Sequence, residues 1–190
     1  MGKLKEILMP ALALFIICLV SSVLLAATNA VTKDTIADNL VKEAAESRKI
    51  AFENAESFSD EQTIEINGTV VLYSEALDAS GVNIGYVFTS AHKGYGGEVR
   101  VMTGIDSDGK VLRSVVLAMD DETPGLGQNA SKPDFLDQFN EKTGPFSWVK
   151  SGGENNEIKG VTSASFTSKA VIECVNDAVN AFALLGGEAA

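Results

Sequence analysis

The segment 7–27 is almost wholly apolar, and no charged residue lies between Glu6 and Lys33. A helix of about 20 apolar residues spans a bilayer hydrocarbon core of ~30 Å. We therefore expect a transmembrane helix at 7–28. A cleaved signal peptide is the alternative, but the apolar part is longer than a typical signal core, and 25–30 is only a loose cleavage site.

Two basic residues, Lys3 and Lys5, precede this segment. Under the positive-inside rule they place the N-terminus, residues 1–6, in the cytoplasm. We therefore expect a single-pass protein of the cell (inner) membrane, with the rest of the chain on the periplasmic or extracellular side.

The chain carries a formal net charge of −11, and its acidic excess lies after the apolar segment. A domain of this charge repels nucleic acid and anionic lipid headgroups, so we expect no nucleic-acid partner. Cys18 lies in the expected membrane helix and Cys174 in an expected C-terminal helix, so no disulfide should join them. With His92 as the only histidine, no zinc or iron–sulfur site is expected from this chain alone.

After the membrane segment, apolar residues recur at helical spacing and charged residues fill the other face. This pattern predicts a helical stalk over 29–60, with helix to about residue 57. From residue 63 the pattern changes to short alternating runs typical of strands. The turn sequence DSDG predicts an antiparallel hairpin between the last two of these strands. The expected strands are 69–76, 83–90, 98–105 and 110–119.

Two helices and one short strand complete the expected C-terminal domain, 61–190. The pattern predicts a short helix at 133–139, a strand at 146–149 and an amphipathic helix that begins near Ser168. The fold class is therefore α+β: an N-terminal transmembrane helix and helical stalk, followed by an antiparallel sheet with packed helices.

The run GVTSASFTS occupies 160–168, directly before the last helix. A helix N-terminus presents free backbone N–H groups and the positive end of the helix dipole, which together bind phosphate. The hydroxyl groups of this run can donate to phosphate oxygens, and one could be esterified. The simpler alternative is that Thr167 or Ser168 caps the helix.

A second run, ETPGLG at 122–127, contains a Pro-Gly turn, and its last glycine allows close backbone approach. The acidic residues 120–122 fit a solvated loop better than a metal site. A third run, GYGG at 94–97, is by itself a weak turn signal, and the neighbouring residues 92–93 are expected in a solvated loop.

Placed after a membrane helix, the runs at 122–127 and 160–168 resemble a family of flavin-carrying proteins. It contains the G subunit of the Rnf complex and the C subunit of the sodium-pumping quinone reductase. In that family FMN is joined through its phosphate to a hydroxyl side chain. The family motif is Asp, two variable residues, Ser or Thr, Gly or Ser, Ala, and the acceptor Thr. Here Thr162, Ser163 and Ala164 match, and Ser165 falls on the acceptor. Lys159 stands at the aspartate position and reverses a charge in the segment that a modifying enzyme reads.

The resemblance implies an FMN-binding domain with FMN attached to Ser165 by a phosphoester, so that the chain is a flavoprotein and a phosphoprotein. Thr162 and Thr167 are fallback acceptors. By the same resemblance, Glu122 and Thr123 contact the flavin ring or its ribityl chain, and Leu126 packs on the ring. The implied cofactor-binding residues are Ser165, Glu122, Thr123, Leu126, Gly127, Thr162, Ser163, Ala164 and Tyr95.

Chain length favours the Rnf G subunit within this family. The implied function is electron relay in a membrane-bound, ion-translocating ferredoxin:NAD oxidoreductase complex. The implied partners are the other subunits of that complex and a flavin transferase. The chain would be a redox subunit without catalytic residues of its own, not a self-contained enzyme. One alternative, favoured by Lys159 and Ser165, is a membrane-anchored interaction or sensor domain of the same fold that has lost covalent flavin. Another is a free-standing flavoprotein that uses a different electron donor.

Overall fold

The computed structural model describes residues 2–186, which fall into two compact units that divide after Glu43. Helix α1, Gly2–Ala51, forms the described part of the first unit and begins the second. Its segment Ile7–Lys33 has a mean hydropathy of 2.7, and by length and composition it can cross a membrane. The expected span 7–28 lies within this segment.

Helix α1 ends earlier than the sequence pattern predicts, at Ala51 instead of about residue 57. The chain turns here because Phe52 and Ala55 are both buried in the core of the second unit. The N–H of Ala55 donates to the carbonyl of Phe52 at 3.3 Å, which closes the turn. Strand β1, Ser57–Phe58, follows directly.

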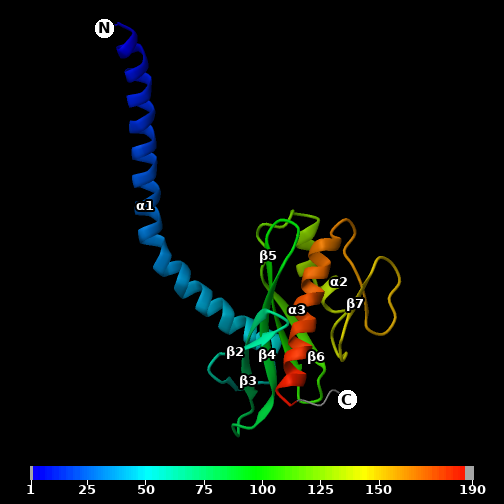
Figure 1. Ribbon diagram of the computed structural model, residues 1–190. Coiled ribbons are helices and arrows are strands. Elements are labelled where there is room, and N and C mark those ends of the chain that lie inside the picture. Colours follow the sequence, from blue (N-terminus) through cyan, green and yellow to red (C-terminus); the bar gives the residue numbers. More distant parts are fainter. Residues whose placement is uncertain (1, 187–190) are drawn as a thin grey trace. The chain divides into compact units, whose positions relative to one another are not determined.

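The second unit is built on a six-stranded antiparallel sheet with the order β1-β3-β4-β5-β6, and β2 pairs with β3 outside this path (Figure 1). The remaining strands of this sheet are β2 Gln62–Ile66, β3 Thr69–Leu77, β4 Asn83–Lys93, β5 Glu98–Asp106 and β6 Val111–Ala118. Strand β2 was missed by the sequence pattern, and the four expected strands match β3 to β6 with small shifts at their ends.

The predicted hairpin between β5 and β6 is confirmed. The Oδ1 atom of Asp106 accepts hydrogen bonds from the N–H groups of Asp108 at 3.0 Å and Lys110 at 2.9 Å. Gly109 has a φ of 80°, a left-handed conformation that glycine adopts at little cost. The side chain of Asp106 thus holds the turn that the DSDG sequence encodes.

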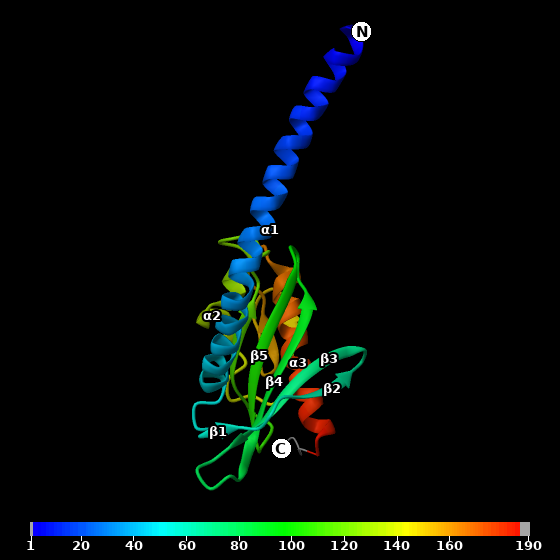
Figure 2. The ribbon, with the colours of Figure 1, turned by 90° about the vertical axis from the view of Figure 1, so that its left-hand side faces the viewer.

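Helix α3, Ser165–Leu184, lies along one face of this sheet, behind β4 and β5 in Figure 2. The main core lies between them: Phe88, Val101 and Ile105 from the sheet pack with Val171 and Val175 from α3. A smaller core on the other face joins Val87 and Met102 to Ala51 and Phe52. Successive strand residues therefore point into two different cores, as the period of a strand requires.

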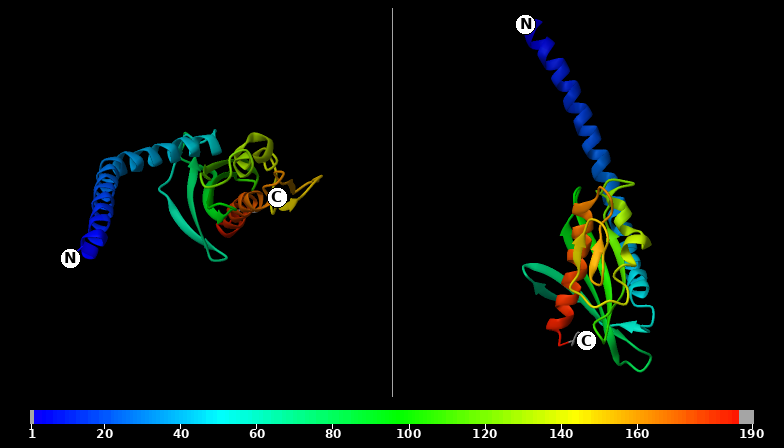
Figure 3. Two further views of the ribbon diagram at one scale, coloured as in Figure 1. Left: turned by 90° about the horizontal axis from the view of Figure 1, so that it is seen from above. Right: turned by 90° about the vertical axis from the view of Figure 1, so that its right-hand side faces the viewer.

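The shorter elements lie between β6 and α3 in the sequence. They are the 3₁₀ helix η1, Gly127–Ser131, the helix α2, Pro133–Leu136, and a parallel pair of strands, β7 Ser147–Val149 and β8 Glu157–Lys159. Strand β7 contacts α3, and both views of Figure 3 place this pair beside that helix. The expected α+β class, with an antiparallel sheet and packed helices after an apolar N-terminal helix, is confirmed.

Truncation of Phe88 tests the main core, because its side chain is 1% exposed and its ring contacts the rings of Tyr73 and Tyr86. We expect Phe88→Ala to lower the free energy of unfolding by about 3–5 kcal/mol. Denaturant unfolding of the detergent-solubilised chain measures this. Val70→Ala, at an exposed position of β3, should change it by less than about 0.5 kcal/mol. Equal losses for the two variants would contradict the described core.

Candidate functional site

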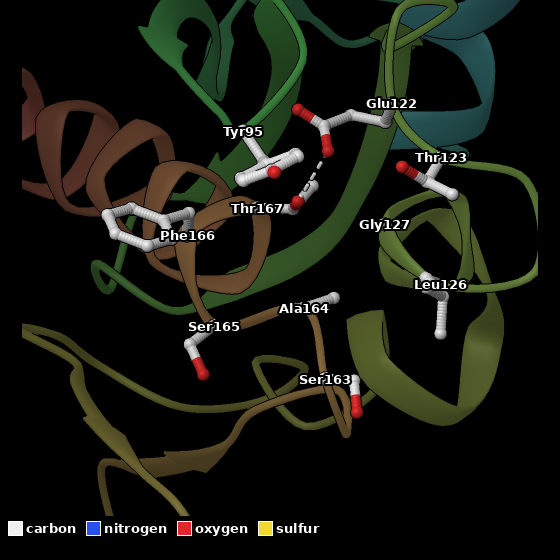
Figure 4. A pocket seen from close by; sticks show the side chains of 10 residues that line it. All are labelled: Tyr95, Glu122, Thr123, Leu126, Gly127, Ser163, Ala164, Ser165, Phe166 and Thr167. Atoms are coloured by element: carbon white, nitrogen blue, oxygen red, sulfur yellow. Dashed lines mark hydrogen bonds between the residues drawn. The ribbon is translucent and has the colours of Figure 1, made fainter.

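A cavity of about 530 Å³ opens where two loops meet the start of α3 (Figure 4). The first loop, 94–97, joins β4 to β5, and the second, 119–126, joins β6 to η1. Three runs that are far apart in the sequence therefore share one pocket. The lining residues are Tyr95, Glu122, Thr123, Leu126, Gly127, Ser163, Ala164, Ser165, Phe166 and Thr167.

The side chain of Glu122 ties these three runs together. It is 2% exposed, and each of its oxygens accepts one hydrogen bond from a different run. Oε1 accepts from the N–H of Gly96 at 3.0 Å, and Oε2 accepts from the hydroxyl of Thr167 at 2.6 Å. Because an unsatisfied buried carboxylate is costly, these two contacts fix both the loop 94–97 and the first turn of α3 against Glu122.

Two glycines make room for this carboxylate. A Cβ atom at Gly94 would collide with Oε1 of Glu122. A Cβ atom at Gly127 would collide with Oε2 of Glu122 and would lie 3.0 Å from the hydroxyl of Thr167. Gly94 of the GYGG run and Gly127 of the ETPGLG run therefore serve the burial of Glu122, which no local turn argument predicts.

Helix α3 begins at Ser165, three residues before the predicted start. Its N-cap is Ala164, which offers no side-chain cap. Ser163 has a φ of 64°, an uncommon conformation for a residue other than glycine, and the N–H of Ala164 donates to the carbonyl of Val161 at 3.1 Å. This tight turn starts the helix early and leaves its first N–H groups without a side-chain acceptor.

The capping alternative is therefore wrong for Thr167 and Ser168, which both lie inside the first turn. The Thr167 hydroxyl is committed to Glu122. The Ser168 hydroxyl donates to the carbonyl of Ala164 at 2.8 Å and accepts from the N–H of Val161 at 2.9 Å. The hydroxyls of this run brace the turn and the pocket wall, and the helix N-terminus faces the cavity uncapped.

Aromatic and apolar side chains form the rim of the cavity. Tyr95 is 73% exposed and Phe166 is 68% exposed, and their ring centroids lie 6.4 Å apart. Leu126 projects from the loop across the cavity from them (Figure 4). The pocket thus combines an apolar rim with a polar end at the start of α3, a composition typical of small-molecule sites.

The cavity brings together eight of the nine residues that the resemblance implies. Thr162 is the exception, because it lines a second cavity of about 400 Å³ together with Lys159. Phe166 was missed, since no periodicity argument marks an exposed phenylalanine in a first helical turn. Its position next to Ser165 was the only available signal.

The chain's histidine lies outside this site. We expected it in a solvated loop, and that prediction is wrong. His92 belongs to β4, and its Nε2 atom lies 2.7 Å from Oδ2 of Asp177 on α3, with Oε2 of Glu173 3.4 Å from Nδ1. Burial raises the pKa of the Cys174 thiol to about 12, so this cysteine is not a reactive nucleophile. Among the side chains that the structure describes, no group of His, Cys, Asp and Glu suits a metal ion.

Comparison with known families gives the class of protein. Residues 94–180 match the model of the FMN-binding domain, and all ten cavity residues fall within that range. Residues 1–48 match the model of the RnfG N-terminal region. A crystal structure of NqrC from Shewanella oneidensis has a similar fold, with a TM-score of 0.50 and 19% identity over 66% of each chain. Fold and site thus define a protein with an FMN-binding domain that follows an apolar helix.

Two curated relatives identify the family within this class. The chain is 32% identical to the G subunit of the proton-translocating ferredoxin:NAD(+) oxidoreductase complex of Clostridium ljungdahlii, over 87% of this chain and 86% of that protein. It is 33% identical to the G subunit of the Na(+)-translocating ferredoxin:NAD(+) oxidoreductase complex of Acetobacterium woodii, over 94% of this chain and 92% of that protein. The chain belongs to the family of Rnf complex G subunits.

The hydrogen bond between Thr167 and Glu122 can be tested by removing its donor. We expect Thr167→Val to lower the free energy of unfolding by about 1–3 kcal/mol, because it leaves a buried carboxylate oxygen without a partner. Thr167→Ser keeps the hydroxyl and should recover most of this loss. Chemical unfolding of each variant gives the values, with Thr123→Val at an exposed wall position as the control. A valine variant as stable as the parent would show that the contact contributes nothing.

Proposed function

We propose that this chain is an electron-relay subunit of an Rnf-type, ion-translocating ferredoxin:NAD(+) oxidoreductase complex, and that it carries FMN joined through its phosphate to Ser165. One observation carries the proposal. A single cavity joins the run 122–127 and the loop 94–97 to Ser165 at an uncapped helix N-terminus. This occurs in a chain whose curated relatives are G subunits of such complexes.

The residues present suit FMN at both ends of the molecule. At one end, the first turn of α3 offers free N–H groups and the positive end of the helix dipole to a phosphate. At the other, Tyr95 and Leu126 offer an aromatic and an apolar surface to a flat ring, and Thr123 offers a hydroxyl group. The volume of about 530 Å³ lies within the range of roughly 300–1,000 Å³ typical of small-molecule sites. When bound, FMN would supply the electron-transfer chemistry, and the chain would hold and orient it.

Ser165 is the acceptor that the geometry favours. It is exposed at the start of α3, and its hydroxyl points away from Glu122 (Figure 4). The two fallback acceptors are less suitable, because the Thr167 hydroxyl is buried against Glu122 and Thr162 lines the other cavity. Ser163, whose side chain is also exposed and lines the site, is the nearest rival.

The attachment is a phosphoryl transfer with no redox change. The Oγ–P bond to Ser165 forms while the donor nucleotide's phosphoanhydride P–O bond breaks. The leaving nucleotide takes that electron pair, and the serine proton is released. A flavin transferase would supply this activated flavin nucleotide, because direct condensation with free FMN would have to expel water. Lys159, which departs from the family motif, lines the second cavity and is not among the residues that line the first.

The remaining partners follow from the family. We propose contacts with the other subunits of the membrane complex, anchoring by the segment Ile7–Lys33, and a flavin domain on the periplasmic or extracellular side. None of the pocket residues needs to act as a catalytic acid or base for electron relay. The chain would therefore be one electron-transfer subunit of a larger enzyme.

Removal of the acceptor hydroxyl tests the attachment site. With a flavin transferase co-expressed, we expect the parent chain and Ser165→Thr to gain the mass of an FMN group and to fluoresce on a denaturing gel. Ser165→Ala should show neither signal, because no phosphoester can form at this position. Ser151→Ala, at an exposed serine outside the cavity, is the matched control and should be modified like the parent. Persistent covalent flavin in Ser165→Ala would show that another residue is the acceptor. An unmodified parent chain would favour the interaction or sensor alternative.

The side of the membrane can be tested with a single exposed cysteine. Val82 is 57% exposed in the turn between β3 and β4, and Cys174 is buried, so Val82→Cys provides a distinctive site in the folded domain. We expect a membrane-impermeant maleimide to label Val82→Cys in intact cells whose outer layers the reagent can enter. The unsubstituted chain, which retains Cys18, controls for background. Labelling that requires lysis would place the domain in the cytoplasm.

A further inference from the structure

Lys169 lies on the same face of α3 as Ser165, one turn further along the helix. Residues four apart in a helix are surface neighbours, with Cβ atoms about 5–6 Å apart. Lys169 is exposed, and it forms no ion pair with any side chain that the structure describes. Its charge is therefore available for a ligand at Ser165.

The ammonium group of Lys169 is held in place by an aromatic ring. Its Nζ atom lies 4.9 Å from the centroid of the Trp148 ring, a cation–π distance. Trp148 is half-buried on β7, a strand that contacts α3. A Cβ atom at Gly160 would collide with its indole nitrogen, so glycine at the start of the 160–168 run lets the indole pack against the chain. Trp148 therefore joins this run to Lys169.

The charges around the cavity indicate what Lys169 can do. The chain has a net charge of −11, and the buried carboxylate of Glu122 lies on the cavity wall. Both oppose the approach of a phosphate. The N-terminus of α3 offsets this with partial positive charge, but Lys169 is the cation one turn from the acceptor. Because Trp148 already restricts its side chain, Lys169 loses less conformational freedom when it binds an anion.

We propose that Lys169, held over Trp148, pairs with the phosphate of the flavin nucleotide at Ser165, both during attachment and in the finished phosphodiester. Lys169 is a positioning residue in this role, since the bond itself forms at Ser165. The proposal rests on the proposed attachment of FMN to Ser165.

The test compares the initial rate of covalent FMN incorporation in the purified full chain, followed by intact mass with a flavin transferase and its flavin nucleotide donor. At low salt we expect Lys169→Gln to slow incorporation about fivefold, the size of effect expected for one exposed charge pair. Lys169→Arg should restore the rate, and Trp148→Leu should slow it by a smaller factor. The matched control is Lys132→Gln, which removes an exposed lysine from the other cavity, outside the 159–165 motif, and should stay within about twofold of the parent. The difference between Lys169→Gln and the parent should shrink in 1 M salt, where the screening length is about 3 Å.

A second measurement separates pairing from folding. The phosphorus NMR signal of the finished phosphodiester should shift between the parent and Lys169→Gln, while the thermal midpoint of the unmodified chains should agree. Incorporation at the parental rate with an unchanged phosphorus signal would overturn the role of Lys169 and leave the attachment at Ser165 standing. A slower rate that arginine does not restore would also overturn it. Absence of flavin from the parent chain would contradict the proposed attachment at Ser165, and the role of Lys169 that rests on it.

Discussion

The arrangement of the pocket depends on one buried carboxylate. Glu122 is 2% exposed, and its two oxygens accept from Gly96 on one loop and from Thr167 on α3. A carboxylate buried without partners would cost several kcal/mol, so the three runs that surround it must assemble together. Gly94 and Gly127 are glycine because this side chain fills the space beside them. The arrangement of the pocket walls therefore follows from the two hydrogen bonds that Glu122 accepts, and it does not need a ligand to form.

At the start of α3, in contrast, backbone N–H groups have no side-chain acceptor. The turn at Ser163 and Ala164 begins the helix without a side-chain cap, and the neighbouring hydroxyls of Thr167 and Ser168 are engaged elsewhere. Such an end is favourable only when an anion or water satisfies it. Under the proposed function, the two features together explain how a strongly acidic domain would bind a phosphate. They also place the exposed Ser165 where that phosphate would be attached.

Local patterns in the sequence predicted the parts of the fold that local physics controls. Alternating residues marked β3 to β6, and Asp106 and Gly109 marked the hairpin. The pattern failed where contacts over long sequence separations decide. The end of α1 depends on the burial of Phe52 and Ala55 in the core, and the position of His92 depends on Asp177, which lies 85 residues away. The start of α3 was missed for a local reason, because the left-handed turn at Ser163 is a conformation that serine rarely adopts. The resemblance supplied most of the pocket residues, but it could not show that both oxygens of Glu122 have partners within the protein.

The central claim is that a flavin phosphate is bonded to the first residue of α3, and the most direct measurement is the mass of the peptide that contains it. The full chain would be matured with a flavin transferase, digested, and sequenced by tandem mass spectrometry. The account predicts the FMN increment on the fragment ions that begin to include Ser165. An increment that localises to Ser163, Thr162 or Thr167, or a fully unmodified peptide, would contradict it.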